Sequence, residues 1–224
     1  MSRKIVLTAD GSSSIFSEEN NQHYHSHFGA MQESVHIFIE AGLCSDALAH
    51  LERVSILEIG FGTGLNALLT CLKAEELHQK IYYESIELHP LTQQEIAQLN
   101  YPALLPHAHA ETLFSALHNA QWNKTEAISE NFTLLKRQIS ATDATYVHEA
   151  FDLVYFDAFS PEAQPALWTK EVFETIYHSM KKGGILLTYC AKGSVKRTLK
   201  EVGFQIEKLP GPIGKREILR AGKA

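Results

Sequence analysis

The residues best suited to chemistry lie at two junctions where a short apolar run meets a loop. Residues 56–64 read ILEIGFGTG, and residues 151–161 read FDLVYFDAFSP. Both apolar runs have the length and the β-branched or aromatic content of strands. In a doubly wound α/β sheet, ligands bind outside the carboxyl ends of the strands. The two junctions therefore predict a cofactor site beside a reaction site.

The glycine loop of the first junction indicates which cofactor to expect. Gly60, Gly62 and Gly64 form the pattern G-x-G-x-G, but Leu65 stands where a dinucleotide fingerprint has its third glycine. A glycine loop that opens a helix still presents backbone N–H groups to an anion, and the carboxylate of a methionine moiety would fit. We therefore predict S-adenosylmethionine rather than NAD.

Two acids support this cofactor site. The apolar run 81–87 ends at Glu87, and a carboxylate at the end of the second strand can accept hydrogen bonds from both ribose hydroxyls of an adenosine. Glu58 lies in the first strand, directly before the glycine loop. The alternative is a tight turn with a solvated acid. The βαβ spacing and the two acids together favour cofactor binding.

Length and composition limit the class of protein. The chain has 224 residues, of which 45% are hydrophobic, and no stretch approaches the ~20 apolar residues of a membrane span. The basic N-terminus has no apolar signal core behind it. The three cysteines are far apart in the sequence and include no C-x-x-C pair, so we expect buried thiols in a reducing cytoplasm and no zinc knuckle.

The pattern along the chain predicts an α/β fold with an N-terminal extension over residues 1–50 and a catalytic domain over 51–224. In the extension we expect a hairpin around residues 9–12 and a helix over 29–41 that ends at Gly42. We expect helices near 65–78, 91–99, 168–181 and 192–202 and strands beginning near Val54, Ile81, Phe132, Asp152 and Ile185. Two terminal strands, 204–208 and 217–220, would complete a seven-stranded sheet whose last strand inserts antiparallel.

The charge is divided unevenly. The net charge is −6, yet residues 170–224 hold twelve Lys or Arg and five Asp or Glu, which gives +7 there and −13 over residues 1–169. Such asymmetry favours a polyanionic partner. The alternative is that these lysines cover solvated helix faces.

The histidines do not predict a metal site. His23, His25 and His27 alternate and would share one face of an extended segment. A cupin-like metal site would also need a barrel, which this chain does not predict. His107 and His109 form a second pair with no connection to the first, so we expect no metal.

Several motifs together resemble one family, the methyltransferase module of bacterial MnmC, a tRNA 5-methylaminomethyl-2-thiouridine methyltransferase. The resemblance covers nearly the whole chain. The shared motifs are Asp10-Gly11-Ser12, Tyr24-His25-Ser26, Gly29-Ala30, Glu33-Ser34, residues 58–66 (EIGFGTGLN), 156–161 (FDAFSP), Gln164-Pro165, Leu167-Trp168-Thr169 and residues 214–217 (GKRE). The aspartate loop and the terminal GKRE are the most specific of these. Family members often carry a fused flavin-dependent oxidase, and here we expect the methyltransferase module alone.

The resemblance implies a Rossmann-like class I methyltransferase fold and a site for S-adenosyl-L-methionine. It implies as substrate the aminomethyl group of uridine 34, in the anticodon region of certain tRNAs, with a functional link to the enzymes that install this group. The cofactor would be held by Glu58, Gly60, Gly62, Gly64, Asn66 and Glu87. The family usually has an acid after the third strand to hold the adenine, whereas this chain has Ser140 there, with Asp143 three residues later.

The reaction itself needs a carboxylate beside the cofactor. Methylating a primary amine requires a neutral nitrogen, and Asp157 can orient the amine and relieve the positive charge that develops. Pro161 would stiffen the loop, and Phe159 could stack on a base. Helix capping is the alternative role of Asp157, and packing that of Phe159. The residues expected to bind the substrate are Tyr24, Phe159, Ser160, Pro161, Lys215 and Arg216.

Two other functions fit the sequence. One is an N-methyltransferase of the same fold that acts on small molecules or proteins, for which the basic segment would be incidental. The other is a catalytically silent module that binds nucleotides or tRNA.

Overall fold

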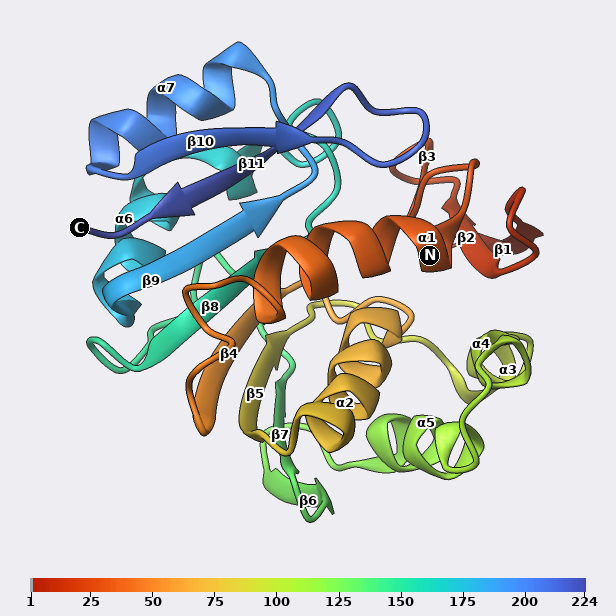
Figure 1. The fold of residues 1–224 in the computed structure, drawn as a ribbon. Coiled ribbons are helices and arrows are strands. Elements are labelled where there is room, and N and C mark those ends of the chain that lie inside the picture. Colours follow the sequence, from red (N-terminus) through yellow and green to blue (C-terminus); the bar gives the residue numbers. More distant parts are fainter. Residues whose placement is uncertain (1) are drawn as a thin grey trace.

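A twisted sheet forms the centre of the protein. The computed structural model describes residues 2–224, and within them eight strands form one sheet in the order β10-β11-β9-β8-β4-β5-β7-β6 (Figure 1). The strands are β4 (Arg53–Ile59), β5 (Lys80–Ile86), β6 (Thr125–Ser129), β7 (Phe132–Arg137), β8 (Phe151–Phe156), β9 (Met180–Thr188), β10 (Gln205–Pro210) and β11 (Glu217–Gly222). The inner strands β9, β8, β4, β5 and β7 are parallel, and β11 inserts antiparallel between β9 and β10. The predicted strand insertion is confirmed.

The predicted number of strands was wrong by one. β6 pairs antiparallel with β7 and forms the edge of the sheet, where the sequence indicated only a loop. The strand is short and irregular, and its register shifts between Ala127 and Ser129. Because such an edge strand is defined by its pairing partner rather than by a strong apolar pattern, its own residues carry little signal.

Helices cover both faces of the sheet. The elements are α1 (Ala30–Ser34), the π-helix η1 (Val35–Leu43), α2 (Leu65–Leu77), α3 (Gln93–Ile96), α4 (Tyr101–Leu104), α5 (Ala110–Asn119), the 3₁₀-helix η2 (Pro165–Trp168), α6 (Lys170–Ser179) and α7 (Gly193–Val202). Figure 1 shows η1 and α2 crossing one face of the sheet. One apolar cluster lies between the sheet and η1, α2 and α5, and a second lies under α6 and α7. This three-layer arrangement confirms the predicted α/β fold class.

The helices differ from prediction in four places. The helix predicted near 91–99 is shortened to α3, and α4 follows as a separate turn that was not predicted. The helix that begins at Ala30 continues past Gly42 to Leu43, and over η1 it is wound with π-type bonds such as Cys44 N–H to Ile39 O (2.8 Å). The helix α5 was not predicted. α6 ends at Ser179, and β9 begins at once, so the Gly183-Gly184 pair lies inside a strand rather than before it.

The first residues form a small second sheet. β1 (Arg3–Leu7) and β2 (Ser13–Ser17) make the predicted hairpin, and β3 (Gln22–His23) adds a third strand. The side chain of Asp10 closes the hairpin turn, because its Oδ1 accepts from the Ser12 N–H (3.0 Å) and from Thr8 Oγ1 (2.8 Å). This small sheet lies at the carboxyl ends of the central strands, where a ligand would bind.

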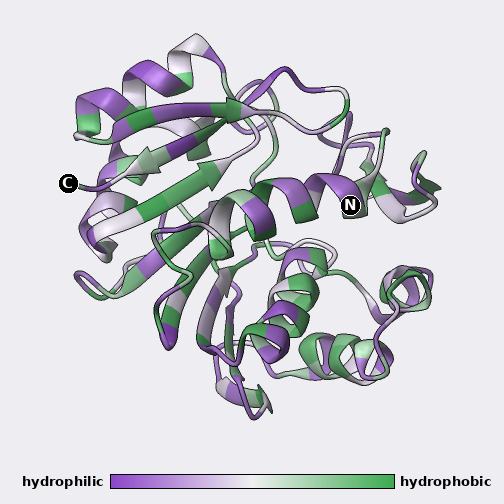
Figure 2. Ribbon diagram, in the orientation of Figure 1, coloured by the Kyte–Doolittle hydropathy of each residue, from purple (hydrophilic) through white to green (hydrophobic). Residues whose placement is uncertain are grey.

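Hydrophobic residues concentrate on the central strands (Figure 2). β8 is buried along its whole length, as a parallel strand covered on both faces should be. Cys71 and Cys190 are buried, but Cys44 is partly exposed, which corrects the prediction of three buried thiols. Within residues 2–224, no helix has both the length and the apolar character needed to cross a membrane.

Candidate active site

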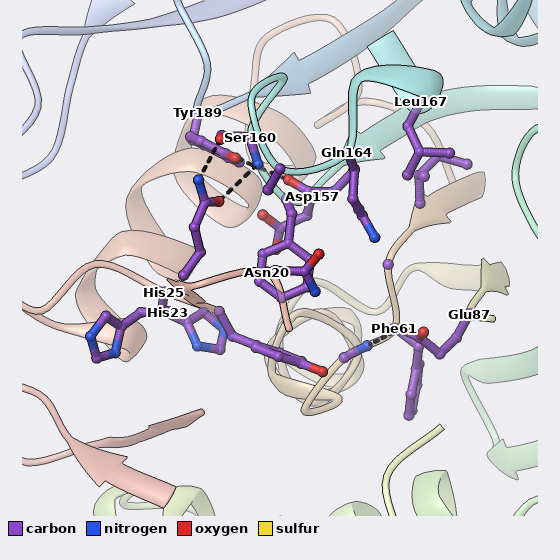
Figure 3. A pocket seen from close by; sticks show the side chains of 18 of the residues that line it. Asn20, His23, His25, Phe61, Glu87, Asp157, Ser160, Gln164, Leu167 and Tyr189 are labelled. Atoms are coloured by element: carbon purple, nitrogen blue, oxygen red, sulfur yellow. Dashed lines mark hydrogen bonds between the residues drawn. The ribbon is translucent and has the colours of Figure 1, made fainter. Parts of the chain in front are cut away.

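A cavity of about 780 Å³ opens at the carboxyl ends of β4, β5 and β8 (Figure 3). Its wall combines segments that are far apart in the sequence: residues 20–28, the glycine loop, the loops after β5, β7 and β8, and the loop between β10 and β11. The volume is in the range of sites for cofactors and drug-sized ligands. Both predicted junctions therefore contribute to one cavity.

The two junctions are in direct contact. The Asp157 N–H donates to Ile59 O (3.0 Å), and the Gly60 N–H donates to Ile86 O (2.9 Å). Gly60 has a φ of +98°, and a Cβ at this position would lie 2.7 Å from Asp157 O. Glycine is needed here for both reasons, because a side chain would be strained and would push the two loops apart.

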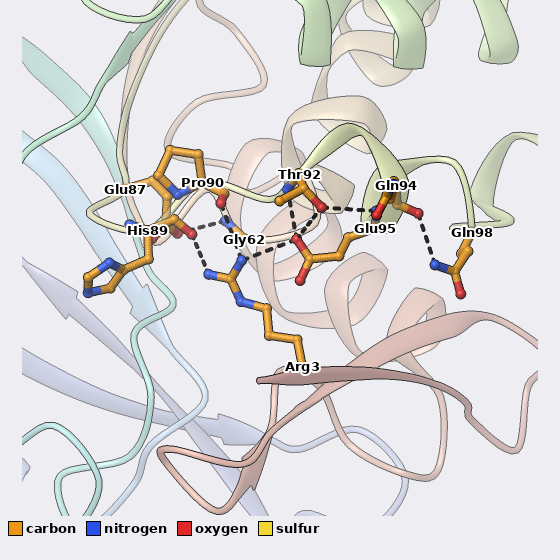
Figure 4. A network of polar contacts seen from close by, with 9 residues as sticks. All are labelled: Arg3, Gly62, Glu87, His89, Pro90, Thr92, Gln94, Glu95 and Gln98. Atoms are coloured by element: carbon orange, nitrogen blue, oxygen red, sulfur yellow. Dashed lines mark hydrogen bonds and ion pairs between the residues drawn. The ribbon is translucent and has the colours of Figure 1, made fainter. Parts of the chain in front are cut away.

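Glu87 connects the glycine loop to the segment after β5. Its Oε2 accepts from the Gly62 N–H (3.1 Å) and its Oε1 accepts from the His89 N–H (2.8 Å). An ionised carboxylate can accept further hydrogen bonds, so Glu87 keeps capacity for a ligand. Arg3 of β1 holds the same segment through Pro90 O (3.2 Å) and Glu95 Oε2 (3.4 Å), as Figure 4 shows.

Asp157 is a partly buried acid next to two other buried polar groups. Its Oδ2 accepts from Asn66 Nδ2 (2.9 Å). Burial, and after it the charge of Glu33, raise the pKa of Asp157 from 3.8 to about 7, although the Asn66 bond and Lys215 oppose this. Below the loop, burial raises the pKa of Glu58 to about 8, and its Oε2 accepts from Ser85 Oγ (2.6 Å). A carboxyl with a pKa near 7 is suited to accept a proton at neutral pH.

A second acid faces the cavity together with a lysine from the other end of the chain. Glu33 is 6% exposed, and its Oε2 accepts from the Ser26 N–H (2.7 Å). Its other oxygen pairs with Nζ of Lys215, which also lies 4.3 Å from the ring centre of Tyr189. The carboxylate and the aromatic face together stabilise the ammonium group.

The loop after β8 is fixed to the N-terminal sheet. Gln22 Nε2 donates to Ser160 Oγ (2.6 Å), and the Ser160 N–H donates to Gln22 Oε1 (3.2 Å). The rings of Tyr24 and Phe159 meet edge to face with centroids 5.0 Å apart. The residues that follow Asp157 are thereby ordered on one side of the cavity.

The structure gathers most of the predicted site residues, but not all. Those that line the cavity are Tyr24, Gly60, Gly62, Asn66, Glu87, Ser140, Asp157, Phe159, Ser160 and Lys215. Those outside its lining are Glu58, Gly64, Asp143, Pro161 and Arg216. Glu58 is fully buried behind the loop, and Asp143 is exposed, so Ser140 rather than Asp143 is the candidate near an adenine. Arg216 lines a neighbouring groove.

Sequence reasoning missed several residues of the cavity wall. Glu33, Tyr189 and Gln22 come from segments with no catalytic pattern of their own. The only available signal was the motif Glu33-Ser34, which was recognised as part of the family resemblance but was given no role. Their place in the cavity depends on long-range contacts.

The histidines fall into separate groups. His23, His25 and His27 all line the cavity wall, and burial lowers the pKa of His25 to about 4. Elsewhere Glu75, His107 and His109 come close, with 3.7 Å from Glu75 Oε2 to a ring nitrogen of each histidine. In this arrangement His107 Nδ1 accepts from the His109 N–H (3.3 Å).

The fold and the cavity define a Rossmann-like class I methyltransferase that uses S-adenosyl-L-methionine. The sequence model of the family described as S-adenosyl-L-methionine-dependent methyltransferase matches residues 107–224, just over half of the chain, so the protein belongs to this family. The predicted cofactor class is confirmed.

The most informative relatives are tRNA-modifying enzymes. The bifunctional protein MnmC of Cupriavidus metallidurans, named for tRNA 5-methylaminomethyl-2-thiouridine biosynthesis, is 30% identical over 230 residues, which are 95% of this chain and 33% of that protein. MnmC of Nitrosospira multiformis is 29% identical over 90% of this chain and 35% of its own length. The chain thus spans about a third of the length of these curated relatives. The resemblance to the MnmC methyltransferase module is confirmed.

A solved structure supports the same fold. The crystal structure of MNMC2 from Aquifex aeolicus superimposes with a TM-score of 0.83 at 24% identity and covers 100% of this chain and 70% of that one. At this identity the likeness concerns the fold, and it extends over the N-terminal sheet as well as the central one.

Proposed function

We propose that this protein methylates the aminomethyl nitrogen on the wobble uridine, U34, of tRNA, which gives 5-methylaminomethyl-(2-thio)uridine. The observation that carries the proposal is Asp157, a carboxyl with a pKa raised to about 7 in the same cavity as the glycine loop. The relatives are named for tRNA 5-methylaminomethyl-2-thiouridine biosynthesis, which supports a tRNA substrate. The basic C-terminal segment agrees with an RNA partner.

Several residues fit the cofactor. When bound, S-adenosylmethionine supplies an electrophilic methyl group on a sulfonium. Backbone N–H groups of the glycine loop would receive the carboxylate of its methionine part, and Glu87 would accept hydrogen bonds from the ribose hydroxyls. Ser140 would lie near the adenine. The positive φ values of Gly60, Gly62 and Gly64 support this assignment, because they form a loop that backbone-binding ligands can approach closely.

Asp157 would act on the attacking amine. It would hold the nitrogen through a hydrogen bond and take the proton released as the nitrogen–carbon bond forms and the carbon–sulfur bond breaks. Asn66 would keep the carboxyl in place through its 2.9 Å bond to Oδ2. The sulfonium charge of the cofactor would favour the ionised form of Asp157 and so prepare it to accept the proton.

The substrate nucleotide must enter the cavity from outside its stack. Enzymes that modify a base commonly take it out of the stack and hold it against aromatic side chains. Phe159 and Tyr24 on the cavity wall are suited to this role. The reaction also needs an earlier enzyme that installs the aminomethyl group, and a tRNA substrate implies action in the cytoplasm.

The test is transfer of a labelled methyl group from S-adenosylmethionine. The acceptors are tRNA that carries 5-aminomethyl-2-thiouridine, the same tRNA without this group, small primary amines and a protein mixture. We expect labelling of the first acceptor alone, on U34. Labelling of small amines or protein instead would support a different N-methyltransferase, and binding without transfer would support a silent tRNA-binding module.

A further inference from the structure

A second, shallower groove opens beside the main cavity. Its volume is about 450 Å³, and it shares Ser160, Tyr189 and Lys215 with the cavity wall. The groove is therefore continuous with the place where the reacting nucleotide would lie. Its remaining wall comes from the start of α7, from β10 and from the loop before β11.

The lining of this groove is strongly cationic. Lys192, Lys208, Lys215 and Arg216 contribute positive charges, and Glu217 is the single carboxylate among its lining residues. These residues come from three separate parts of the C-terminal segment, and the fold brings them together. A concave surface with one sign of charge focuses the electrostatic field and attracts the opposite charge.

The cations of the groove are not fully neutralised by the protein. The guanidinium of exposed Arg216 has no ion pair or side-chain hydrogen bond to any residue in 2–224. Glu217 is shared between Lys208 (2.9 Å) and Lys196 (3.3 Å), so one acid serves two lysines. Lys192 pairs with Glu162, whose side chain is 62% exposed. Exposed pairs of this kind are worth little and exchange readily for a stronger anion.

We propose that this groove binds the backbone phosphate next to the nucleotide that enters the cavity, an inference that rests on the proposed tRNA substrate. Lys192, Lys208 and Arg216 would contact the phosphate oxygens. A base that reaches the cavity keeps its own sugar and phosphates outside the cavity. The groove lies directly beside the cavity, because Ser160 and Tyr189 line both. Arginine and lysine are the usual residues for such contacts.

Lys215 has a different place in this scheme. Its ammonium group points to Glu33 and Tyr189 between the cavity and the groove. The sequence predicted Lys215 and Arg216 as one substrate-binding pair, but the fold directs them to different surroundings. The phosphate site therefore centres on Arg216 and Lys208, and Lys215 is left out of its test.

The test compares two double variants with the same loss of charge. Lys208→Gln/Arg216→Gln removes two cations from the groove. Lys182→Gln/Lys200→Gln removes two exposed cations of the same segment that lie outside it. Lys182 stands six residues before the end of β9 at Thr188, about 20 Å along the strand at the usual rise. Both variants should keep the wild-type affinity for S-adenosylmethionine by calorimetry, which also checks folding.

We expect only the groove variant to bind tRNA more weakly. For a single strand, log K falls with log salt by about 0.7 per neutralised phosphate, so loss of this one phosphate contact costs roughly fivefold in affinity at 0.1 M salt. The salt slope should become shallower by about 0.7. An unchanged slope and affinity, or an equal change in the control variant, would overturn the phosphate site.

A change in the RNA provides a second measurement. The RNA for this measurement is an anticodon stem-loop in which the phosphates beside residue 34 are replaced by uncharged methylphosphonates. The wild type should bind this RNA less tightly than the unmodified stem-loop. The groove variant should bind the two RNAs equally. The two losses of affinity, one from the protein change and one from the RNA change, are non-additive only if the groove contacts this phosphate. Additive losses would contradict the contact. Failure of the wild type to methylate the aminomethyl-bearing tRNA would instead contradict the proposed function.

Discussion

Replacing Asp157 with Asn should stabilise the folded protein at alkaline pH while it removes activity. The folded state raises the pKa of this carboxyl from 3.8 to about 7, chiefly by burial. Between these two pH values the folded chain holds a proton that the unfolded chain has already released. Raising the pH through this window therefore destabilises the wild type.

The magnitude follows from the size of the window. Each pH unit corresponds to about 1.4 kcal/mol, so a window of about three units gives roughly 4 kcal/mol as an upper limit. Because Asp157 faces a cavity that water can enter, we expect about half of this. Asn cannot ionise, and its carbonyl oxygen can still accept the bond from Asn66 Nδ2. The variant should match the wild type near pH 4 and exceed it by about 2 kcal/mol at pH 8.

Urea unfolding in the absence of cofactor, at several pH values from 4.5 to 8.5, measures this difference. Asp143→Asn is a matched control, since Asp143 is exposed and lies outside the cavity lining. Methyl transfer by Asp157→Asn should fall by about 10²- to 10⁴-fold, the usual contribution of an acid–base group. A stability difference that stays constant with pH would refute the reasoning, and full turnover would show that Asp157 is structural.

Four further variants test the cavity. Glu33→Gln should lower the pKa seen in the acidic limb of the pH–rate profile, and Lys215→Met should raise it. The shifts differ in direction because these two charges act on Asp157 with opposite sign. Shifts in the same direction would exclude this coupling. Gly60→Ala should abolish cofactor binding by calorimetry without unfolding the chain, since its Cβ would lie 2.7 Å from Asp157 O. Glu87→Ala should weaken S-adenosylmethionine binding by at least tenfold through lost ribose contacts and a freed Gly62 N–H, and unchanged affinity would remove Glu87 from the cofactor site.

The central strands and the glycine loop were predictable because their signals are local. Apolar runs of strand length, the G-x-G-x-G loop and the acid at residue 157 each occupy one short stretch of sequence. The alternation of strands and helices then restricts the topology to a few α/β arrangements. The carboxyl ends of parallel strands meet at one edge, so the meeting of Gly60 and Asp157 could be expected from the order of elements alone.

Elements that depend on a partner were not predictable. β6 is a strand because β7 lies beside it, and η1 is wound as a π-helix while it packs on α2 and β9. β6 has no strong pattern of its own, and the helix predicted over 29–41 gave no indication of the π winding of η1. Their conformation follows from tertiary contacts that local propensity does not contain.

By itself the sequence determined the fold class, the cofactor and the position of Asp157 at the end of its strand, because local backbone preference and strand order are enough for these. Only the tertiary structure decided the chemical state of that acid and its neighbours. Glu33 and Lys215, 182 positions apart, form one ion pair in the cavity wall. The pKa of Asp157 is raised chiefly by burial, and then shifted by the charges of that pair. Electrostatic interactions depend on distance and on access of water, and both are known only once the chain has folded.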